Sequence, residues 1–318
     1  KGSAVKILTG AILPNGVDTV LLEEDVERKE QNSISFRGPL KVGANTRTSG
    51  EDVKKGEKLF SVGHTVRPQD LALLIATGTK DVDVYSLLRV GILSTGNELL
   101  DTTSKYSPVV EKGKVFDSNR PMLLSLSRSW GFEVVDLGII YDQRSLLRER
   151  LDNASSEVDV IISSGGASSG DEDHVAKLIK SEGIMENWRI AIKPGRPLAL
   201  GLWNGTPIFG LPGNPVAAFV CALIFARPAL GILSGCGWAN PVGYKVESSF
   251  NKKKKPGRRE YLRARINKDG KAEIFSSEGS GKISSLSWSS GLLELLEHEE
   301  KVSKGQLVRY IPYSSFEL

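Results

Sequence analysis

Residues 89–234 constrain the fold more than any other part of the chain, because short apolar runs alternate there with stretches of helical periodicity. Strands are predicted at residues 90–93, 133–137, 158–162, 189–192, 198–202 and 207–211, and helices at residues 121–130, 145–154, 174–181 and 216–230. Alternation of this kind is typical of right-handed βαβ units. The sequence therefore predicts an α/β domain with a mostly parallel sheet, in which the last helix, apolar nearly all round, should be buried.

The flanking segments predict smaller, strand-rich parts. Residues 1–52 are expected to form a β-rich module with strands at 4–8, 19–22 and 33–36, and residues 53–88 a connecting domain with a strand at 58–62 and a helix that starts near Pro68. Strands at 244–250, 260–266, 272–275 and 307–311 predict a small barrel or sandwich, and we expect a C-terminal β-barrel domain over residues 235–318. The chain begins at Lys1 without a methionine, so an N-terminal portion is expected to precede it.

Composition and charge argue against several classes of protein. The chain has 318 residues, enough for two or three domains, because single cores stop growing at roughly 250 residues. Its 42 basic and 38 acidic residues nearly balance, so no nucleic acid partner is implied. No apolar stretch approaches the roughly 20 residues that span a bilayer, and no signal-peptide pattern is found, so we expect a cytoplasmic protein with no membrane partner. Cys221 and Cys236 are expected to be reduced thiols, since neither a disulfide framework nor a zinc site is indicated.

Four loops that follow predicted strands carry unusual sequences. They are Ser-Thr-Gly-Asn-Glu at 94–98, the glycine-rich and acidic stretch at 163–173, Lys-Pro-Gly-Arg-Pro at 193–197 and Leu-Pro-Gly-Asn-Pro at 211–215. Ligands of open parallel sheets bind beyond the carboxyl ends of the strands. If the strands are parallel, all four loops lie on one rim of the sheet and can form one site.

Backbone groups at this rim suit a ligand that carries phosphate. Gly165 and Gly166 let the backbone approach an anion closely and offer N–H donors, and Asn214 stands where the positive end of a helix begins. Asp117 and Asp142 precede two other helices, and each is expected to accept a free backbone N–H group.

Charged side chains at the rim add a second set of candidates. Lys193 and Arg196 supply positive charge for an oxyanion, while Asp173 and Glu98 supply the hard oxygen ligands that Mg²⁺ prefers. Each loop taken alone is better explained by tight packing or by a helix dipole. The coincidence of four such loops on one predicted rim favours a functional site.

The acidic loop also matches the motif of a different class of enzyme. Residues 166–170 match the G-x-S-x-G pattern of serine hydrolases, with Ser168 as the nucleophile. Such an enzyme needs a histidine base, and His64, His174 and His298 are the available ones. None has a setting that favours this role, so the hydrolase reading ranks below the anion site. The basic run at 252–259 is expected to form a solvated hairpin from which an arginine can reach an anion.

Taken in order, the loops are similar to those of a known family. The matching segments are Thr-Gly-Ala at 9–11, Pro-Asn-Gly at 14–16, Gly-Glu-Asp at 50–52, Ser-Thr-Gly-Asn-Glu-Leu at 94–99, Asp-Ser-Asn at 117–119, Asp-Leu-Gly at 136–138, Ser-Gly-Gly-Ala-Ser-Ser-Gly-Asp at 164–171, Lys-Pro-Gly-Arg-Pro at 193–197 and Gly-Leu-Pro-Gly-Asn-Pro at 210–215. Together they resemble the molybdopterin molybdenumtransferase family of MoeA type, which includes the E domain of gephyrin. The resemblance covers essentially the whole chain. It implies Mg²⁺-dependent insertion of molybdenum from molybdate into adenylylated molybdopterin, with release of AMP.

The resemblance also assigns roles to individual residues. The matching positions are Glu98, Asp142 and Asp173 on the acidic side, Ser168, Lys193, Arg196 and Pro197 on the oxyanion side, Arg258 and Ser284 in an outer wall, and Thr9 and Asp52 in the β-rich module. It implies that Asp173, with Glu98, holds the metal, and that the acids, Lys193 and Arg196 are catalytic. It further implies a homodimer whose active site is shared between subunits, with Thr9 and Asp52 facing the partner's cleft.

Three departures from the family pattern stand out. Arg196 replaces a common lysine, which keeps the charge but changes the donor geometry, and Ala217 replaces a common serine. The family's Met-Asp-Gly-Tyr-Ala segment, which carries an acidic site residue, would precede Lys1, and a fragment without it can be inactive. Two alternatives stay open: a molybdopterin adenylyltransferase, whose family has Gly-Gly-Thr-Gly where this chain has Gly-Gly-Ala-Ser at 165–168, and a non-catalytic dimeric scaffold of gephyrin type.

Overall fold

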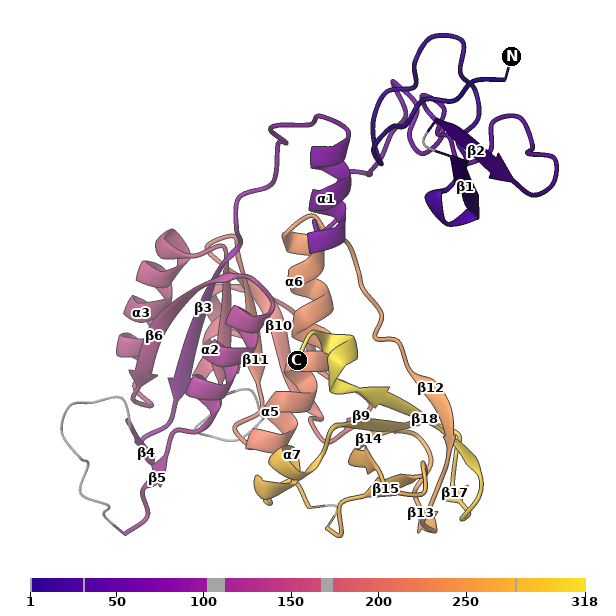
Figure 1. The fold of residues 1–318 in the computed structure, drawn as a ribbon. Helices are drawn as coiled ribbons and strands as arrows, with labels where there is room; N and C mark the ends of the chain where they lie inside the picture. Colours follow the sequence, from indigo (N-terminus) through magenta and orange to yellow (C-terminus); the bar gives the residue numbers. More distant parts are fainter. Residues whose placement is uncertain (1, 31, 102–111, 167–173, 278) are drawn as a thin grey trace. The chain divides into compact units, whose positions relative to one another are not determined.

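The computed structural model describes residues 2–30, 32–101, 112–166, 174–277 and 279–318 (Figure 1). These residues form two compact units. The first unit comprises Lys1–Ser61 with Val66–Asp81, and the second comprises Val62–Thr65 with Val82–Leu318. The finer division into four domains stays a prediction.

The first unit contains little regular structure. Its elements are the short helix η1 (Glu23–Asp25), the antiparallel strands β1 (Val26–Glu30) and β2 (Ser33–Phe36), and the helix α1 (Pro68–Ala76). The strand at 33–36 and the helix start at Pro68 are as predicted, whereas residues 4–8, 19–22 and 58–62 form no strand. The helix is favoured because Pro68 presets its first turn and the Asp70 carboxylate accepts the Arg67 N–H group at 2.9 Å.

The second unit is built around a six-stranded sheet with the order β6-β3-β7-β11-β10-β8. Its strands are β3 (Arg89–Thr95), β6 (Glu133–Ile140), β7 (Val160–Ser164), β8 (Ile184–Arg189), β10 (Pro197–Trp203) and β11 (Thr206–Leu211). Strands β6, β3, β7 and β11 are parallel. The prediction of an α/β domain with a mostly parallel sheet is therefore confirmed.

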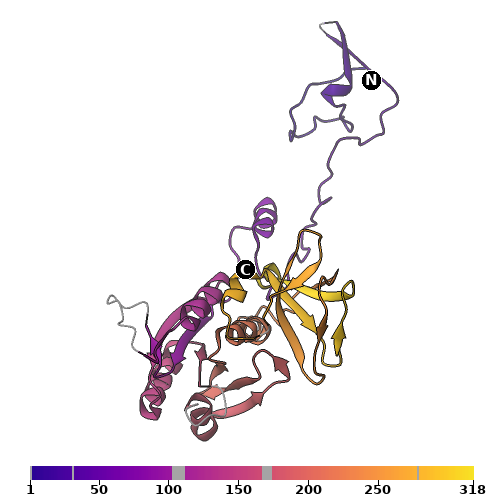
Figure 2. The same cartoon turned by 90° about the horizontal axis from the view of Figure 1, so that it is seen from below.

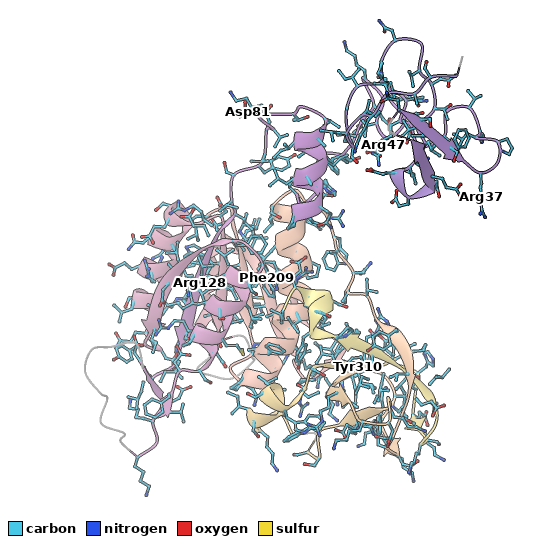
Figure 3. The ribbon with its side chains drawn as sticks, in the orientation of Figure 1. Arg37, Arg47, Asp81, Arg128, Phe209 and Tyr310 are labelled. Atoms are coloured by element: carbon cyan, nitrogen blue, oxygen red, sulfur yellow. The ribbon has the colours of Figure 1, made fainter. Side chains whose placement is uncertain are left out.

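Helices cover both faces of this sheet. They are α2 (Asn119–Ser129), α3 (Arg144–Glu157), α4 (His174–Glu182), α5 (Pro215–Cys221) and α6 (Arg227–Leu233). Neighbouring residues of β7 point to opposite faces, as a strand requires. Ile162 packs in the core that contains α2 and α5, together with Phe209 (Figure 3), whereas Ile161 packs in the core that contains α3 and α4. The alternating apolar runs of the sequence thus form two cores around one central sheet.

The direction of β10 differs from expectation. It runs antiparallel to both β11 and β8, so the condition of parallel strands, under which the four loops were placed on one rim, does not hold for β10. The cause is a two-residue hairpin between β10 and β11, in which Asn204 and Gly205 both have positive φ, +47° and +83°. Residues 193–197 still lie at the rim, because an antiparallel strand begins at the edge where its parallel neighbours end.

The predicted strand at 189–192 is also corrected. Strand β8 ends at Arg189, and the next strand, β9 (Ile192–Lys193), leaves the central sheet. It pairs instead in parallel with strand β14 (Arg259–Ile266) of the C-terminal part, with Lys193 opposite Glu260. The loop that carries Lys193 is therefore held by two sheets.

The apolar helix after β11 is longer than predicted. Helix α5 continues through the π-helical segment η2 (Ala222–Ala226) into α6, which gives 19 residues from Pro215 to Leu233. Pro228 does not end the helix, because the wider π turn just before it accommodates a residue that lacks an N–H group. The statement that no apolar stretch approaches membrane length was wrong. Among the described residues this helix is the one that is long and apolar enough to cross a membrane, but 61% of its apolar stretch is buried inside the protein, as expected for a core helix.

The C-terminal part is a second sheet with the order β12-β18-β16-β14-β15 (Figure 2). Its further elements are β12 (Tyr244–Glu247), β13 (Lys252–Lys253), β15 (Ala272–Ile274), α7 (Ser284–Trp288), β16 (Gly291–Leu295), β17 (Lys301–Val302), β18 (Leu307–Pro312) and η3 (Tyr313–Phe316). The core includes Leu262, Leu293 and Tyr310, the last labelled in Figure 3. One isolated bridge, Ser248 to Ala272, links the two outer strands, but no ladder among the described residues closes the sheet, so the β-barrel stays a prediction.

Candidate active site

A pocket of about 930 Å³ lies at the carboxyl ends of β3, β7 and β11. Loops of the central domain line it together with Gly279, Ser280, Gly281 and Ile283 of the C-terminal part. This is where ligands bind in open α/β sheets. The predicted site residues that line it are Glu98, Asp142, Gly165, Gly166, Lys193, Pro197 and Asn214.

Glu98 is held at the pocket by the tight turn after β3. Gly96 has φ of +154°, and a Cβ atom added there would lie 2.6 Å from Glu98 Oε2. The carboxylate therefore packs directly on the Gly96 backbone, which only glycine allows.

Asp142 joins two rim loops to each other. Its Oδ2 atom accepts the Asn97 N–H group, and its own N–H group donates to Asn97 Oδ1, both at 3.0 Å. The expectation that Asp142 caps the following helix was wrong, because the side chain is engaged with Asn97, and Gln143 at the N-cap position of α3 makes no side-chain cap. This exchange of hydrogen bonds fixes one acid of the pocket against the loop that carries Glu98.

The two glycines after β7 are required by close packing. A Cβ atom on Gly165 would lie 2.6 Å from the Thr95 carbonyl oxygen, and one on Gly166 would lie 2.7 Å from Val175 Cγ2. The expectation that Gly165 offers its N–H group to a ligand is wrong, since that group donates to the Leu211 carbonyl at 3.1 Å. Ser168 and Asp173, predicted for the oxyanion and the metal, lie outside the described residues.

Two polar atoms of the residues that line this pocket have no hydrogen-bond partner within the described part of the chain. They are Thr95 Oγ1 and Asn119 Oδ1, both on buried side chains. The Asn119 amide nitrogen donates at 2.7 Å to Ser164 Oγ and to the Gly213 carbonyl, which fixes the orientation of the amide. Sequence reasoning quoted Asn119 only as part of a motif and missed this role as a bridge between strand ends.

A buried arginine stabilises the loops beside the pocket. Arg120 is 2% exposed and contacts Asp117 at 3.1 Å, Asp136 at 2.5 Å and Asp101 at 2.7 Å. Burial acts to lower the pKa of the Arg120 guanidinium, but the carboxylates outweigh burial and raise it, so the side chain stays charged. Asp117 accepts the Arg120 N–H group and the Ser94 hydroxyl, both at 3.1 Å, and so has the predicted capping role.

Lys193 is the cationic side chain that lines the pocket in the described residues. Its Nζ atom lies 3.2 Å from Glu260 Oε1, and its side chain is 38% exposed. Gly195 lies next to Cys221, and a Cβ atom there would approach Cys221 Sγ to 2.3 Å. Burial raises the pKa of the Cys221 thiol to about 12, so the side chain stays a neutral thiol, and Sγ donates to the Gly195 carbonyl oxygen at 3.6 Å.

Several predicted residues lie elsewhere. Arg196, Arg258 and Ser284 are exposed and do not line the pocket, although Ile283, next to Ser284, does. Thr9 and Asp52 are exposed residues of the first unit. Asn214 lines the pocket, but its Oδ1 atom accepts the N–H groups of its own helix, from Val216 at 3.1 Å and Ala217 at 3.3 Å.

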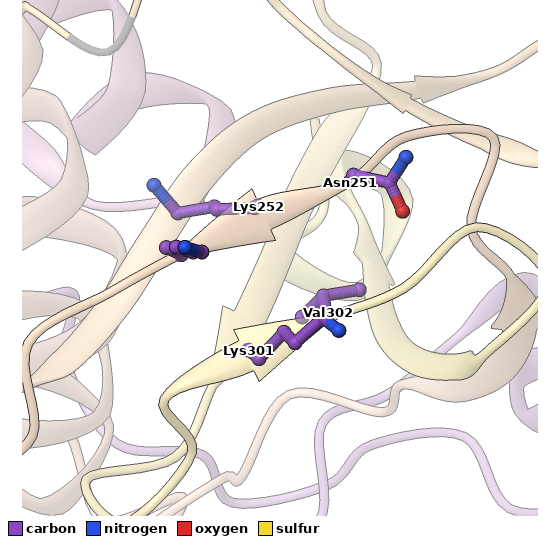
Figure 4. A pocket seen from close by; sticks show the side chains of 5 residues that line it. Asn251, Lys252, Lys301 and Val302 are labelled. Carbon is purple, nitrogen blue, oxygen red and sulfur yellow. The ribbon is translucent and has the colours of Figure 1, made fainter.

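A second, smaller hollow of about 280 Å³ lies between β13 and β17 (Figure 4). Asn251, Lys252, Lys253, Lys301 and Val302 line it, and no predicted site residue does. The basic run was expected to be a solvated hairpin. That expectation is wrong for Lys252, which is only 6% exposed.

Comparison with known proteins identifies the class first. Residues 91–231 match the family described as "Probable molybdopterin binding domain", so the central sheet and its rim define a molybdopterin-binding α/β domain. Residues 1–78 match the MoeA N-terminal region (domain I and II), and residues 245–313 match the MoeA C-terminal region (domain IV).

Whole-chain relatives then identify the family. The chain is 35% identical over 317 residues to the molybdopterin molybdenumtransferase of Haemophilus influenzae, covering 98% of this chain and 78% of the relative. The corresponding protein of Nostoc sp. is 32% identical, over 98% of this chain and 73% of the relative. The MoeA structure from Pyrococcus horikoshii has a TM-score of 0.79 at 31% identity, over 97% of this chain and 75% of that one. The chain belongs to the molybdopterin molybdenumtransferase (MoeA) family, and is an enzyme of molybdenum cofactor biosynthesis.

Proposed function

We propose that this protein inserts molybdenum from molybdate into adenylylated molybdopterin and releases AMP with the molybdenum cofactor. The observation that carries the proposal is one pocket that brings together Lys193, Glu98 and Asp142 at the strand ends. Molybdate, the dithiolene-bearing pterin phosphate and the adenylate are all anions. A pocket of about 930 Å³ is of a size that holds ligands of this class.

The proposed mechanism is positional and electrostatic. Lys193 attracts the oxyanion, and its ammonium group is already oriented by Glu260 before the ligand arrives. Thr95 and Asn119 contribute polar atoms that have no protein partner among the described residues, so a ligand can satisfy them with little cost of rearrangement. Pro194 and Pro197 limit the freedom of the segment that carries Lys193.

Mg²⁺ is part of the proposal, with Glu98 and Asp173 as its expected ligands. The described residues contain no cluster of three or more metal-ligating side chains, and Asp173 lies outside them. Glu98 and Asp142 still fit the ion, because Mg²⁺ is commonly held by one or two carboxylates together with water and substrate phosphate. Bound there, it would neutralise charge on the phosphoryl oxygens of the link to be broken.

The assembly and location are also proposed. We expect a homodimer in which Thr9 and Asp52 reach the partner's cleft, a cytoplasmic location, and no nucleic acid or membrane partner. The dimer and the shared cleft are what the resemblance to the MoeA family implies. Sedimentation of the purified protein tests the dimer, and a monomer at micromolar concentration would contradict it.

The proposal is tested by incubating purified protein with Mg²⁺, molybdate and adenylylated molybdopterin and measuring AMP. Wild-type protein should release AMP in a molybdate-dependent way, and Lys193→Ala should release it at least about a hundredfold more slowly, as expected for loss of an electrostatic group at the reacting centre. Lys253→Ala, which removes an exposed lysine of the smaller hollow, is the matched control and should be active. Absence of AMP release by the wild type would remove the proposal.

The adenylyltransferase alternative makes a different prediction. Such an enzyme would consume ATP with free molybdopterin in the absence of molybdate. The flanking parts that match MoeA regions favour the molybdenumtransferase. ATP consumption under these conditions would reverse that preference.

A further inference from the structure

Among the described residues, Lys193 forms a group with two further charged side chains, which lie outside the pocket. Glu260 is 4% exposed, and its two carboxylate oxygens face different lysines. Oε1 accepts a hydrogen bond from Lys193 Nζ at 3.2 Å, and Oε2 lies 3.4 Å from Lys252 Nζ. The Lys252 side chain is 2% exposed, so it is buried with the carboxylate.

The backbone fixes this arrangement. Glu260 is on β14, paired with Lys193 of β9 on one side and with Leu295 of β16 on the other. Lys252 is on β13, which pairs with β17 through Val302. Strand pairing thus sets Lys193 opposite Glu260 and Lys252 opposite Val302, and the contact between Lys252 and Glu260 joins the two sheets.

The two lysines interact with Glu260 in different ways. The Lys193 contact has hydrogen-bond geometry and therefore sets the direction of the ammonium group. The Lys252 contact is an ion pair only, since Glu260 Oε2 has no hydrogen-bond partner among the described residues. Lys252 thus acts on the carboxylate through charge.

Charge sharing has a consequence for the pocket. A buried carboxylate paired with one lysine cancels most of the field of that lysine at short range. A second buried lysine on the same carboxylate restores positive potential, and Lys193, at 38% exposed, is the member that lines the pocket. Lys252 itself is too buried to touch a pocket ligand.

We propose that Glu260 and Lys252 are positioning residues for the oxyanion: Glu260 orients the Lys193 ammonium, and Lys252 keeps Glu260 from cancelling its charge. This rests on the proposed function in that it takes the pocket ligand to be an anion. Neither residue was a predicted site residue, and Lys252 was assigned to a solvated hairpin.

The test measures the Kd of molybdate by calorimetry on the whole protein. Lys252→Met should raise the Kd about tenfold, which corresponds to about 1.4 kcal/mol. Lys253→Met is the matched control, since it removes the same charge from the next, exposed position of β13, and should change the Kd less than about twofold. In a Lys193→Met background, Lys252→Met should also change the Kd less than about twofold, because residues that act through one group are not additive.

A double variant separates orientation from charge. Glu260→Gln with Lys252→Met removes one charge of each sign, so molybdate should bind within about threefold of wild type. The kcat should fall about tenfold, because Glu260 no longer orients the Lys193 ammonium group. Wild-type kcat in this variant would overturn the role of Glu260.

Either of two results would contradict the role of Lys252. The first is that Lys252→Met and Lys253→Met change the Kd of molybdate equally. The second is that Lys252→Met raises this Kd as much in the Lys193→Met background as in the wild type. If wild-type protein does not bind molybdate, the proposed function fails and this inference with it. If wild-type protein binds molybdate and only the Lys252 effect is missing, the inference alone fails.

Discussion

Replacing Arg120 by methionine tests whether the buried ion cluster beside the pocket stabilises the second unit. The change leaves Asp117 buried without its cation, and breaking one partner of a buried pair costs about 3–5 kcal/mol. Asp136 and Asp101 are each 38% exposed, so losing their contacts adds at most about 1 kcal/mol each. Asp117 keeps hydrogen bonds from Ser94 and from a backbone N–H group, which places the expected loss at about 3–4 kcal/mol.

The free energy of unfolding is measured by urea titration followed by tryptophan fluorescence. All five tryptophans belong to the second unit, so the signal reports on the part that contains Arg120. Arg128→Met is the matched control, because Arg128 is an exposed arginine of the same helix (Figure 3) and should cost no more than about 0.5 kcal/mol. A loss below about 1 kcal/mol for Arg120→Met would refute the reasoning.

Three further predictions use other contacts. Burial raises the pKa of Cys221 to about 12, so almost none of it is thiolate at pH 8. An aromatic disulfide reagent should therefore titrate one thiol, Cys236, in the native protein and two after denaturation. Rapid reaction of two thiols in the native protein would contradict this. Gly195→Ala should cost about 2–4 kcal/mol in the same urea assay, from the clash with Cys221 Sγ and φ of +104°, and Cys221→Ala should recover part of that loss; full additivity of the two changes would argue against the clash. Asn214→Ala removes the N-cap of α5 and should lower Tm by about 2–4 °C for a loss of about 1 kcal/mol, whereas an unchanged Tm would show that the cap is replaced by other donors or water.

The central fold was open to prediction because periodicity reports burial. The runs around Ile161 and Ile162 indicated a strand buried on both faces, and the structure places them in two different cores. The direction of β10 was also accessible, since Asn204-Gly205 between two apolar runs is a strong hairpin signal that was overlooked.

The site was predictable only in part. Loops at strand ends indicated where Glu98, Asp142 and Lys193 would lie, because topology alone brings such loops to one rim. The partner of Lys193 was not accessible, since Glu260 comes 67 residues later and meets it through a pairing between two sheets. The exposed position of Arg196, two residues past the bend at Pro194, likewise depends on tertiary packing rather than on local pattern.

The pairing of β9 with β14 matters for anyone who would exchange parts between members of this family. A chimera cut at residue 234 would pair β9 with a strand from the other parent, and that parent would then supply the residue opposite Lys193. The natural unit of exchange is therefore the pair of segments that contain both strands, even though they are far apart along the chain. A library built on the linear order of domains would separate Lys193 from the strand that carries its partner.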